Sequence, residues 1–423
     1  MAYRRRIVDD SLDELINEIP ALLLDGPKGI GKTATALQRA TTVYRLDDRS
    51  QLQLVEADPN GVLLHPGPLL IDEWQRFPPI WDAIKRNADS ENPTGPFIMT
   101  GSPYMPNAEI HSGSGRIHEV RMRPMTLPER GVATPTVSLR ALAESQGKIK
   151  GTNSNFGLIQ YVEEIVASGF PGIRKLTPGA RRAQLDSYLA NIVHKDLKEA
   201  GYNVRRPDTV LAWLKAYAAA TATTTSFEKI RDAANSGNDS TPAKTTVSVY
   251  VDVLKMLRIL DDIPAWLPGS NFLSELGQAP KHHLVDPALA ARALGMTPER
   301  LLRGDEGPIR FPREGALLGA FFESLVTLHI RVYAQAMNAK VSHLRTKDTR
   351  HEVDLILSTD HGKILGIEVK LSPTVTDDDV KHLHWLKENA KTEVIDLIVV
   401  TTGESAFRRE DGVAVIPLSL LGP

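Results

Sequence analysis

The 423-residue sequence contains no cysteine, and this absence excludes three kinds of site at once. A disulfide framework, a cysteine-based zinc finger and a thiol nucleophile all require that residue. A chain without cysteine is also compatible with a reducing compartment. Any catalytic chemistry must therefore come from hydroxyl, carboxylate, amine, imidazole or backbone groups.

The sequence also lacks an excess of either charge, with 50 Lys and Arg residues against 52 Asp and Glu residues. This balance excludes an overall basic coat for nucleic acid, although a local basic patch stays open. No window approaches 18 uninterrupted apolar residues, and the first twenty residues lack the apolar core of a signal peptide. We therefore expect a cytoplasmic protein with no membrane partner.

Short apolar runs alternate with helical segments over the first 135 residues, which predicts a doubly wound parallel sheet. Helices are expected from Lys32 to about Ala40 and over residues 80–89. The five candidate strands cover residues 21–24, 42–48, 69–72, 97–102 and 117–122.

Residues 26–33, GPKGIGKT, satisfy the phosphate-binding pattern G-x-x-x-x-G-K-[ST] between a strand and a helix. Glycines let successive backbone N–H groups point at phosphate oxygens, and the helix N-terminus adds its positive end. Lys32 is expected to reach the β and γ phosphates, and the Thr33 hydroxyl to bind Mg²⁺. The plainer alternative is a glycine-rich surface turn. The expected nucleotide contacts are Gly26, Pro27, Lys28, Gly29, Ile30, Gly31, Lys32, Thr33, Ala34, Thr100 and Ser102.

Residues 69–73, LLIDE, match a Walker B strand. Asp72 would hold Mg²⁺ through its water shell, and Glu73 would act as the base that polarises the attacking water. An ordinary strand ending in two exposed acids is the alternative. Thr100 or Ser102 ends the next strand and is expected to contact the γ-phosphate or orient water, against a plain turn.

An arginine finger is expected from the group that follows, with Arg116 as the candidate. Arg121 and Arg123 lie nearby in the sequence. The finger could act at its own nucleotide or at that of a neighbouring subunit in a homo-oligomer. Structural salt bridges are the alternative for each of these arginines.

These motifs together resemble prokaryotic AAA-type ATP-binding proteins that carry a large C-terminal domain of uncharacterised function. The pattern of Asp72, Glu73 and Gln75 and the Gly-Arg before the fifth strand are fairly specific to that family. The resemblance implies ATP binding and hydrolysis but no known substrate. One departure is Lys28, where the family commonly has arginine. The resemblance covers nearly the whole chain, on the segments YRRRIVDDSLDELI, GPKGIGKT, LLIDEWQRFP, FIMTGSP, GRIHEVRMRPMTLPER, SGFPG, GAFFES and EVDLIL…GIEVKLS.

The middle of the chain has the order helix, helix, loop, helix and the short strand RILDDI, which is typical of a winged helix. Its last helix, residues 243–258, could read DNA. Phosphate contacts need basic side chains, and these are few, so DNA binding and protein packing both stay open. The basic residues are Lys244, Lys255 and Arg258, with Lys229 and Arg231 upstream.

The C-terminal part places Glu323 on a helix, Asp354 on a strand, and Glu368 and Lys370 on the next strand. This order is that of the restriction-endonuclease-like core. Asp354 and Glu368 would share Mg²⁺, while Lys370 would stabilise the attacking hydroxide. A solvated hairpin with paired charges is the alternative, so this second metal site is only a hypothesis.

The sequence therefore predicts four regions, with ATP and Mg²⁺ as cofactors. The leading hypothesis is an ATPase that couples hydrolysis to motion of a C-terminal half that binds nucleic acid or another partner. An ATP-dependent nuclease and a nucleotide-gated protein-binding switch remain as alternatives. The regions are a P-loop AAA-type ATPase domain (1–135), a helical connector (136–205), a winged-helix-like domain (206–270) and a restriction-endonuclease-like α/β domain (271–423).

Overall fold

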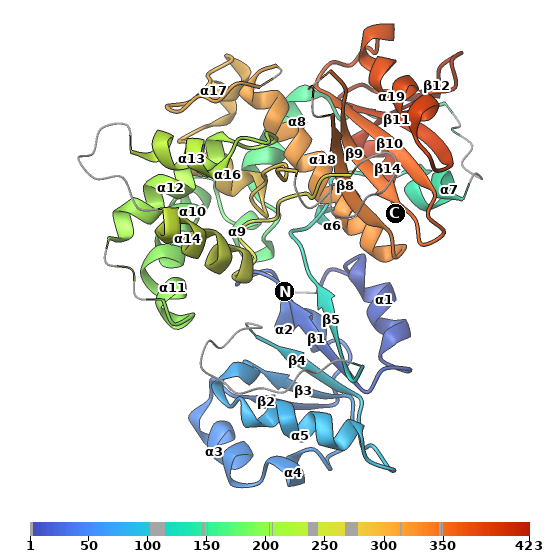
Figure 1. Ribbon diagram of the computed structural model, residues 1–423. Helices are drawn as coiled ribbons and strands as arrows, with labels where there is room; N and C mark the ends of the chain where they lie inside the picture. The colour runs from blue at the N-terminus through green and yellow to red at the C-terminus, as the bar shows by residue number, and fades with distance from the viewer. Residues whose placement is uncertain are drawn as a thin grey trace.

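The computed structural model places the N-terminal sheet in a lobe of its own, below the helices and the second sheet (Figure 1). β5 and the segment after it run from this lobe into the rest of the molecule. The structure describes residues 3–101, 115–144, 149, 151–202, 204, 206–235, 244–266, 278–313, 315–346, 348 and 350–423.

The N-terminal sheet has five parallel strands in the order β2-β3-β4-β1-β5. All five strands that the apolar runs predict are present. The strand that precedes the glycine loop lies second from one edge, and β4 separates it from β3. The strands are β1 (Ala21–Asp25), β2 (Thr42–Arg45), β3 (Leu69–Asp72), β4 (Phe97–Thr100) and β5 (Ile117–Arg121).

Alternation along the strands gives this sheet two apolar faces. Leu22, Leu70 and Ile98 join a core that continues into the helical and C-terminal regions. Leu23 and Ile71 join a smaller core on the other face. Because helices cover both faces, the doubly wound class is confirmed. The covering helices are α1 (Val8–Leu15), α2 (Lys32–Ala36), α3 (Arg49–Ala57), α4 (Pro59–Val62) and α5 (Pro79–Ala88).

Helix α2 is shorter than the sequence predicts, since it ends at Ala36 instead of near Ala40. The chain then tightens into i to i+3 hydrogen bonds, from Gln38 N to Thr35 O (3.2 Å) and from Arg39 N to Ala36 O (3.0 Å). The Arg39 guanidinium is ion-paired with buried Asp9 at 2.8 Å, which fixes this turn against α1.

The helical region follows a short helix α6 (Leu127–Arg130) and packs beside the second sheet (Figure 1). The strand expected at RILDDI is reduced to isolated bridges, Leu260 to Leu284 and Ile263 to Lys281. Pro264 has no N–H to continue a ladder, and the winged-helix prediction is therefore not confirmed. The helices are α8 (Leu158–Ala167), α9 (Pro171–Arg174), α10 (Pro178–Asn191), α11 (Leu197–Glu199), α12 (Pro207–Ala219), α13 (Phe227–Ala234), α14 (Lys244–Met256), α16 (Pro287–Ala293) and α17 (Pro298–Leu302).

The second sheet has the order β7-β12-β13-β11-β10-β9-β8 and mixes parallel with antiparallel pairs. Strand β7 takes part by pairing with β12, while β6 pairs with β14 in a separate two-stranded sheet. The strands of the two sheets and the helices beside them are β6 (Val137–Ser138), α7 (Leu139–Ala143), β7 (Thr152–Asn153), α18 (Leu317–Ala336), β8 (Lys340–Arg345), β9 (Glu352–Ser358), β10 (Ile364–Lys370), α19 (Asp377–Asn389), β11 (Val394–Thr401), β12 (Ser405–Arg408), β13 (Ala414–Pro417) and β14 (Leu421–Gly422).

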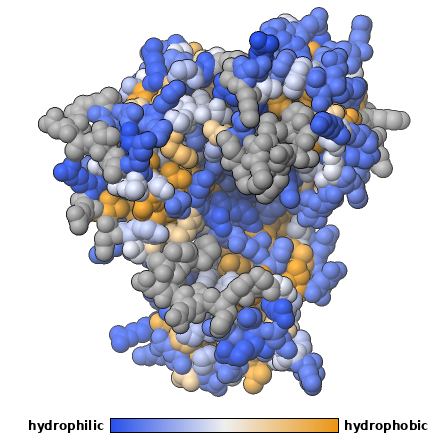
Figure 2. All heavy atoms as spheres, viewed as in Figure 1, coloured by the Kyte–Doolittle hydropathy of each residue, from blue (hydrophilic) through white to orange (hydrophobic). Residues whose placement is uncertain are grey.

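Helix α18 is the one helix among the described residues that is long and apolar enough to cross a membrane. Its apolar window is 83% buried inside the protein, so it packs as a core helix. The face shown in Figure 2 is largely hydrophilic, with apolar side chains scattered along the middle of the molecule.

Replacing Phe322 with Ala tests this core role. Phe322 is 0% exposed on α18 and packs edge-on against Tyr161 of α8, with ring centroids 5.2 Å apart. We expect the free energy of unfolding to fall by about 3–5 kcal/mol in denaturant titration, because the cavity cannot fully collapse. Leu302→Ala, at a residue 44% exposed, is the control and should cost less than about 1 kcal/mol. Equal losses in the two variants would contradict the assignment.

Candidate nucleotide site

The glycine loop between β1 and α2 needs its glycines for steric reasons. Gly29 and Gly31 have φ of 78° and 101°, which side chains rarely adopt. A Cβ on Gly26 would lie 2.5 Å from the carbonyl oxygen of Met122. Ile30 is fully buried in the core and anchors the loop. The loop is therefore a built part of the fold, and the alternative of a plain surface turn does not fit it.

Lys32 is half-buried at the start of α2. Its ammonium donates to the carbonyl oxygens of Gly26 (2.7 Å) and Pro27 (3.1 Å). Burial lowers the pKa of Lys32 to about 8, although the charges of Asp25 and Glu73 act in the opposite direction. A desolvated ammonium held by neutral carbonyls beside a curled glycine loop fits a phosphate group, which would supply the missing negative charge.

Asp72, at the end of β3, joins the ends of three elements. Its Oδ1 accepts a hydrogen bond from the Thr33 hydroxyl at 2.8 Å, and another from the Thr100 hydroxyl. The predicted phosphate-loop threonine, the Walker B acid and the polar end of β4 thus converge on one carboxylate. Hydroxyl and carboxylate oxygens are the ligands that Mg²⁺ prefers, so Thr33 and Asp72 fit that ion. Ser102, the alternative to Thr100, lies outside the described residues.

Glu73 follows directly and has a left-handed backbone, with φ of 57°. Such a conformation costs about 1–3 kcal/mol in a residue other than glycine, and it turns the chain out of the strand. The Gln75 side-chain amide donates to Glu73 Oε2. The Asp72, Glu73 and Gln75 pattern therefore has a physical basis: Gln75 fixes the orientation of the carboxylate that the sequence predicts as the base.

Arg116 does not lie at this end of the sheet. Ala21 of β1 is level with Ile117, and Asp25 is level with Arg121. Arg116 therefore lies at the end of the strands opposite to the loop. The four residue steps from Ile117 to Arg121 span about 13 Å at about 3.3 Å each. Arg116 instead pairs with Asp89 and is 46% exposed. The expectation that it acts on its own nucleotide is wrong, and action on a neighbouring subunit stays a prediction.

Lys28, the departure from the family pattern, reaches the helical region. Its ammonium pairs with Asp196 at 2.7 Å and Glu199 at 2.5 Å. The Tyr188 hydroxyl donates to the Lys28 carbonyl oxygen at 3.0 Å. No local sequence pattern indicates these contacts, because their partners lie about 170 residues away along the chain. The loop is thus fastened to helices as well as to its own sheet.

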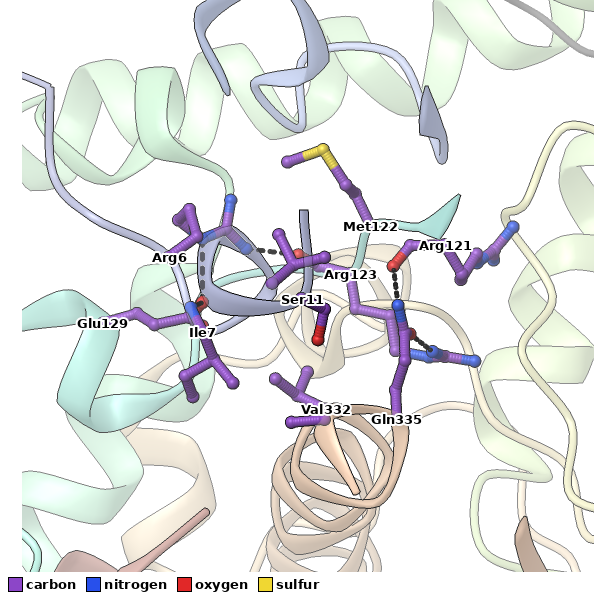
Figure 3. Close-up of a pocket in the computed structure, with 11 residues that line it drawn as sticks. Arg6, Ile7, Ser11, Arg121, Met122, Arg123, Glu129, Val332 and Gln335 are labelled. Atoms are coloured by element: carbon purple, nitrogen blue, oxygen red, sulfur yellow. Dashed lines mark hydrogen bonds and ion pairs between the residues drawn. The ribbon is translucent and has the colours of Figure 1, made fainter. Parts of the chain in front are cut away.

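The lead-in segment also holds the loop. Buried Arg6 pairs with Glu129 at 2.9 Å and donates to the carbonyl oxygens of Ile30 (3.3 Å) and Arg123 (2.7 Å). Figure 3 shows Arg6, Glu129 and Arg123 around a pocket that Val332 and Gln335 of α18 close from the other side. One guanidinium therefore connects the phosphate loop to the segment that leaves the N-terminal lobe.

An ion-pair cluster lies at the base of the loop. Asp25, fully buried immediately before Gly26, pairs with Arg121 at 3.0 Å and with Arg258 at 2.6 Å. Arg258 follows α14 and also pairs with Glu119 of β5 at 2.8 Å. The predicted candidate Arg121 is thus engaged with a carboxylate adjacent to the loop.

Asp261 continues this cluster into the C-terminal half. It pairs with Arg123 at 3.0 Å and with Arg331 of α18 at 3.3 Å, and it lies 3.7 Å from Arg121. Burial by itself would raise the pKa of Asp261, but Arg123, Arg331 and Arg121 outweigh it and hold the pKa well below its usual range. The carboxylate is therefore ionised and joins three arginines from two parts of the chain.

The four C-terminal candidates do come together. The backbone N–H of Val369 donates to Asp354 Oδ2 at 2.9 Å, and Lys370 lies 3.4 Å from Glu368. Burial raises the pKa of Glu323 to about 8 and raises that of Glu368 as well. Burial also opposes ionisation of Asp354, but nearby lysines outweigh it and lower the pKa. One of these lysines is Lys281, which the sequence motifs do not predict at this position.

Three matches to known families cover most of the chain. Residues 18–130 match an AAA domain, residues 159–300 match a domain of unknown function (DUF8612), and residues 318–421 match another (DUF4143). No curated protein sequence matches the chain. The N-terminal lobe is therefore a P-loop ATPase domain of the AAA type, and the match supports ATPase activity.

Among solved structures, the chain is similar to the Walker-type ATPase PABY2304 of Pyrococcus abyssi, at 15% identity and a TM-score of 0.41, covering 69% of this chain and 96% of that one. It is also similar to the Aeropyrum pernix ORC2 protein in ADPNP-ADP complexes, at 12% identity and a TM-score of 0.30 over 70% and 91% of the two chains. The Aeropyrum pernix ORC1 protein in complex with DNA gives 13% identity and a TM-score of 0.26 over 69% and 92%.

The pKa of Lys32 predicts how nucleotide affinity changes with pH. The ammonium is charged below about pH 8 and loses its proton above it, so binding a phosphate at higher pH must first take up a proton. Affinity for ATP, measured by calorimetry, should fall roughly eightfold between pH 7.5 and pH 9. Lys32→Arg keeps its charge over this range, and its affinity should be independent of pH. The same slope in both proteins would contradict the prediction.

Proposed function

We propose that the chain binds ATP with Mg²⁺ at the glycine loop and hydrolyses it. The observation that carries the proposal is the convergence of Thr33 and Thr100 on the carboxylate of Asp72, beside the half-buried ammonium of Lys32. When bound, Mg²⁺ would neutralise charge on the phosphates. Thr33 and Asp72 would hold this ion, directly or through water.

Each remaining residue then has a defined task. The loop amides and Lys32 bind the phosphates, for which Lys32 leaves the carbonyls of Gly26 and Pro27. Glu73 accepts the proton of the attacking water, and Gln75 positions its carboxylate. Thr100 keeps Asp72 oriented through the hydroxyl that it donates.

We further propose that the ion-pair cluster couples this site to the C-terminal half. Asp25 lies directly before the loop and is among the charges that act on Lys32, so movement of Lys32 to a phosphate changes the field at Asp25. Asp25 is held by Arg258, from the helical region. Three residues further on, Asp261 is bound to Arg331 of α18. Arg121 pairs with Asp25 and lies 3.7 Å from Asp261, so a change in the loop has a continuous set of ion pairs through which to act.

The hypothesis of DNA binding through α14 receives less support. Four of the five basic residues in and near α14 pair with acids of the same chain. The pairs are Lys244 with Glu228, Lys255 with Asp262, Arg258 with Asp25 and Arg231 with Asp232. Phosphate contacts would have to compete with these pairs. We therefore retain the proposal that the C-terminal half binds a partner, which is either a protein or a nucleic acid. The four regions that the sequence predicts stay part of this proposal.

Two substitutions separate binding from hydrolysis. Lys32→Ala should weaken ATP binding at least about a hundredfold, because it removes a charge-assisted bond to the phosphates in a partly desolvated site. Glu73→Gln should leave the Kd within about threefold of wild type and reduce turnover at least about a hundredfold. Binding is measured by calorimetry and turnover by phosphate release. Glu73→Gln turnover at the wild-type rate would remove Glu73 as the base.

Arg258→Gln tests the coupling. It should leave ATP affinity nearly unchanged, because Asp25 keeps its pair with Arg121, but should reduce the nucleotide-dependent change in hydrogen exchange over α18 that we expect in the wild type. Arg231→Gln, at a surface pair with Asp232 in the same region, is the matched control and should retain that change. If Arg258→Gln retains it too, the signal does not pass through Asp25 and Arg258.

A further inference from the structure

The carboxylates of the second sheet surround a lysine that belongs to a different segment. Lys281 is 1% exposed, and its ammonium lies 2.9 Å from Glu323, 3.0 Å from Glu352 and 2.9 Å from Asp354. Glu323 comes from α18, while Glu352 and Asp354 come from β9. Three acids from two elements thus each accept one hydrogen bond or ion pair from a single cation.

This geometry is that of an ammonium and not of a divalent metal. Lys has three N–H donors, which matches the three carboxylates, and the distances are those of charge-assisted hydrogen bonds. A divalent ion would need oxygens at about 2.0–2.6 Å in the same position. The ammonium occupies that position. Within the described part of the chain, no group of three acids or histidines is arranged to hold a metal.

The remaining groups of the cluster are also engaged. Asp354 Oδ2 accepts the N–H of Val369 at 2.9 Å, and Glu368 is paired with Lys370. The residues present therefore do not fit the metal that the order Asp, Glu-x-Lys implies.

Lys281 is held in this position by the backbone. Its N–H donates to the carbonyl oxygen of Ile263, and the Ile263 N–H donates back to Lys281, both at 2.9 Å. This antiparallel bridge belongs to the segment that follows α14. The ion cluster therefore fastens the helical region onto α18 and β9.

We infer that Lys281 is the resident cation of this cluster and replaces a divalent metal, so that the C-terminal domain has no metal-dependent phosphodiester cleavage and the lysine instead joins the helical region to the sheet. Breaking a buried pair of this kind leaves uncompensated charge, which is strongly destabilising. Removing the lysine should consequently create a site that a divalent cation can enter.

Mn²⁺ is the probe, and binding is followed by calorimetry on nucleotide-free full-length protein. Asp72→Asn is included throughout, so that the ATP site contributes no metal ligand. With Lys281 present we expect no stoichiometric Mn²⁺ binding. Lys281→Ala should bind one Mn²⁺ at least about tenfold more tightly than the protein that keeps Lys281. It should also melt at a higher temperature when Mn²⁺ is added. The further change Asp354→Asn should remove both effects.

The inference is overturned in either of two ways. The lysine-containing protein could bind one Mn²⁺ and lose it on Asp354→Asn, or a folded Lys281→Ala protein could fail to gain a site. If Lys281→Ala does not fold, Lys281→Met keeps the stem of the side chain, and the first measurement decides without either variant. Because every protein carries Asp72→Asn, these outcomes are independent of whether the chain hydrolyses ATP.

Discussion

The hydrogen bond from Thr33 to Asp72 is the contact on which the proposed function depends. It brings the first turn of α2 to within 2.8 Å of the end of β3. These elements are not adjacent in the sequence, and β4 separates β3 from β1, the strand that precedes α2. Thr100 of the intervening strand β4 completes the arrangement. With Lys32 half-buried alongside, the three ends form a site that combines a cation with hard oxygen ligands. Such a combination suits a metal-bound polyphosphate.

Charge also connects this site to the rest of the chain. Asp25, Arg121, Arg258 and Asp261 form one set of buried or half-buried ion pairs between the loop and α18. Pairs of this kind are poor sources of net stability, because desolvation offsets most of the attraction. Removing one partner is nevertheless costly, so the cluster has few alternative arrangements. A network that can adopt only a few arrangements can switch between two discrete ones. Coupled motion of two parts of a protein requires such a switch.

The sequence predicted what depends on short segments. Short apolar runs predicted all five strands of the first sheet, and two motifs predicted Lys32, Thr33, Asp72 and Glu73. The predictions from sequence failed where the structure depends on strand register or on contacts between distant segments. Arg116 was misplaced because motif spacing does not say which edge of a sheet a residue occupies. Lys281 was missed because its acids lie more than 40 residues away along the chain. The edge strands β6 and β7 depend on partners near the C-terminus and leave no local pattern.

The most direct test of the nucleotide site is a crystal structure with Mg²⁺ and a non-hydrolysable ATP analogue. Our account predicts that the Lys32 ammonium leaves the Gly26 and Pro27 carbonyls to contact a phosphate, with the metal beside Thr33 and Asp72. A nucleotide bound elsewhere, with Lys32 still on those carbonyls, would contradict it.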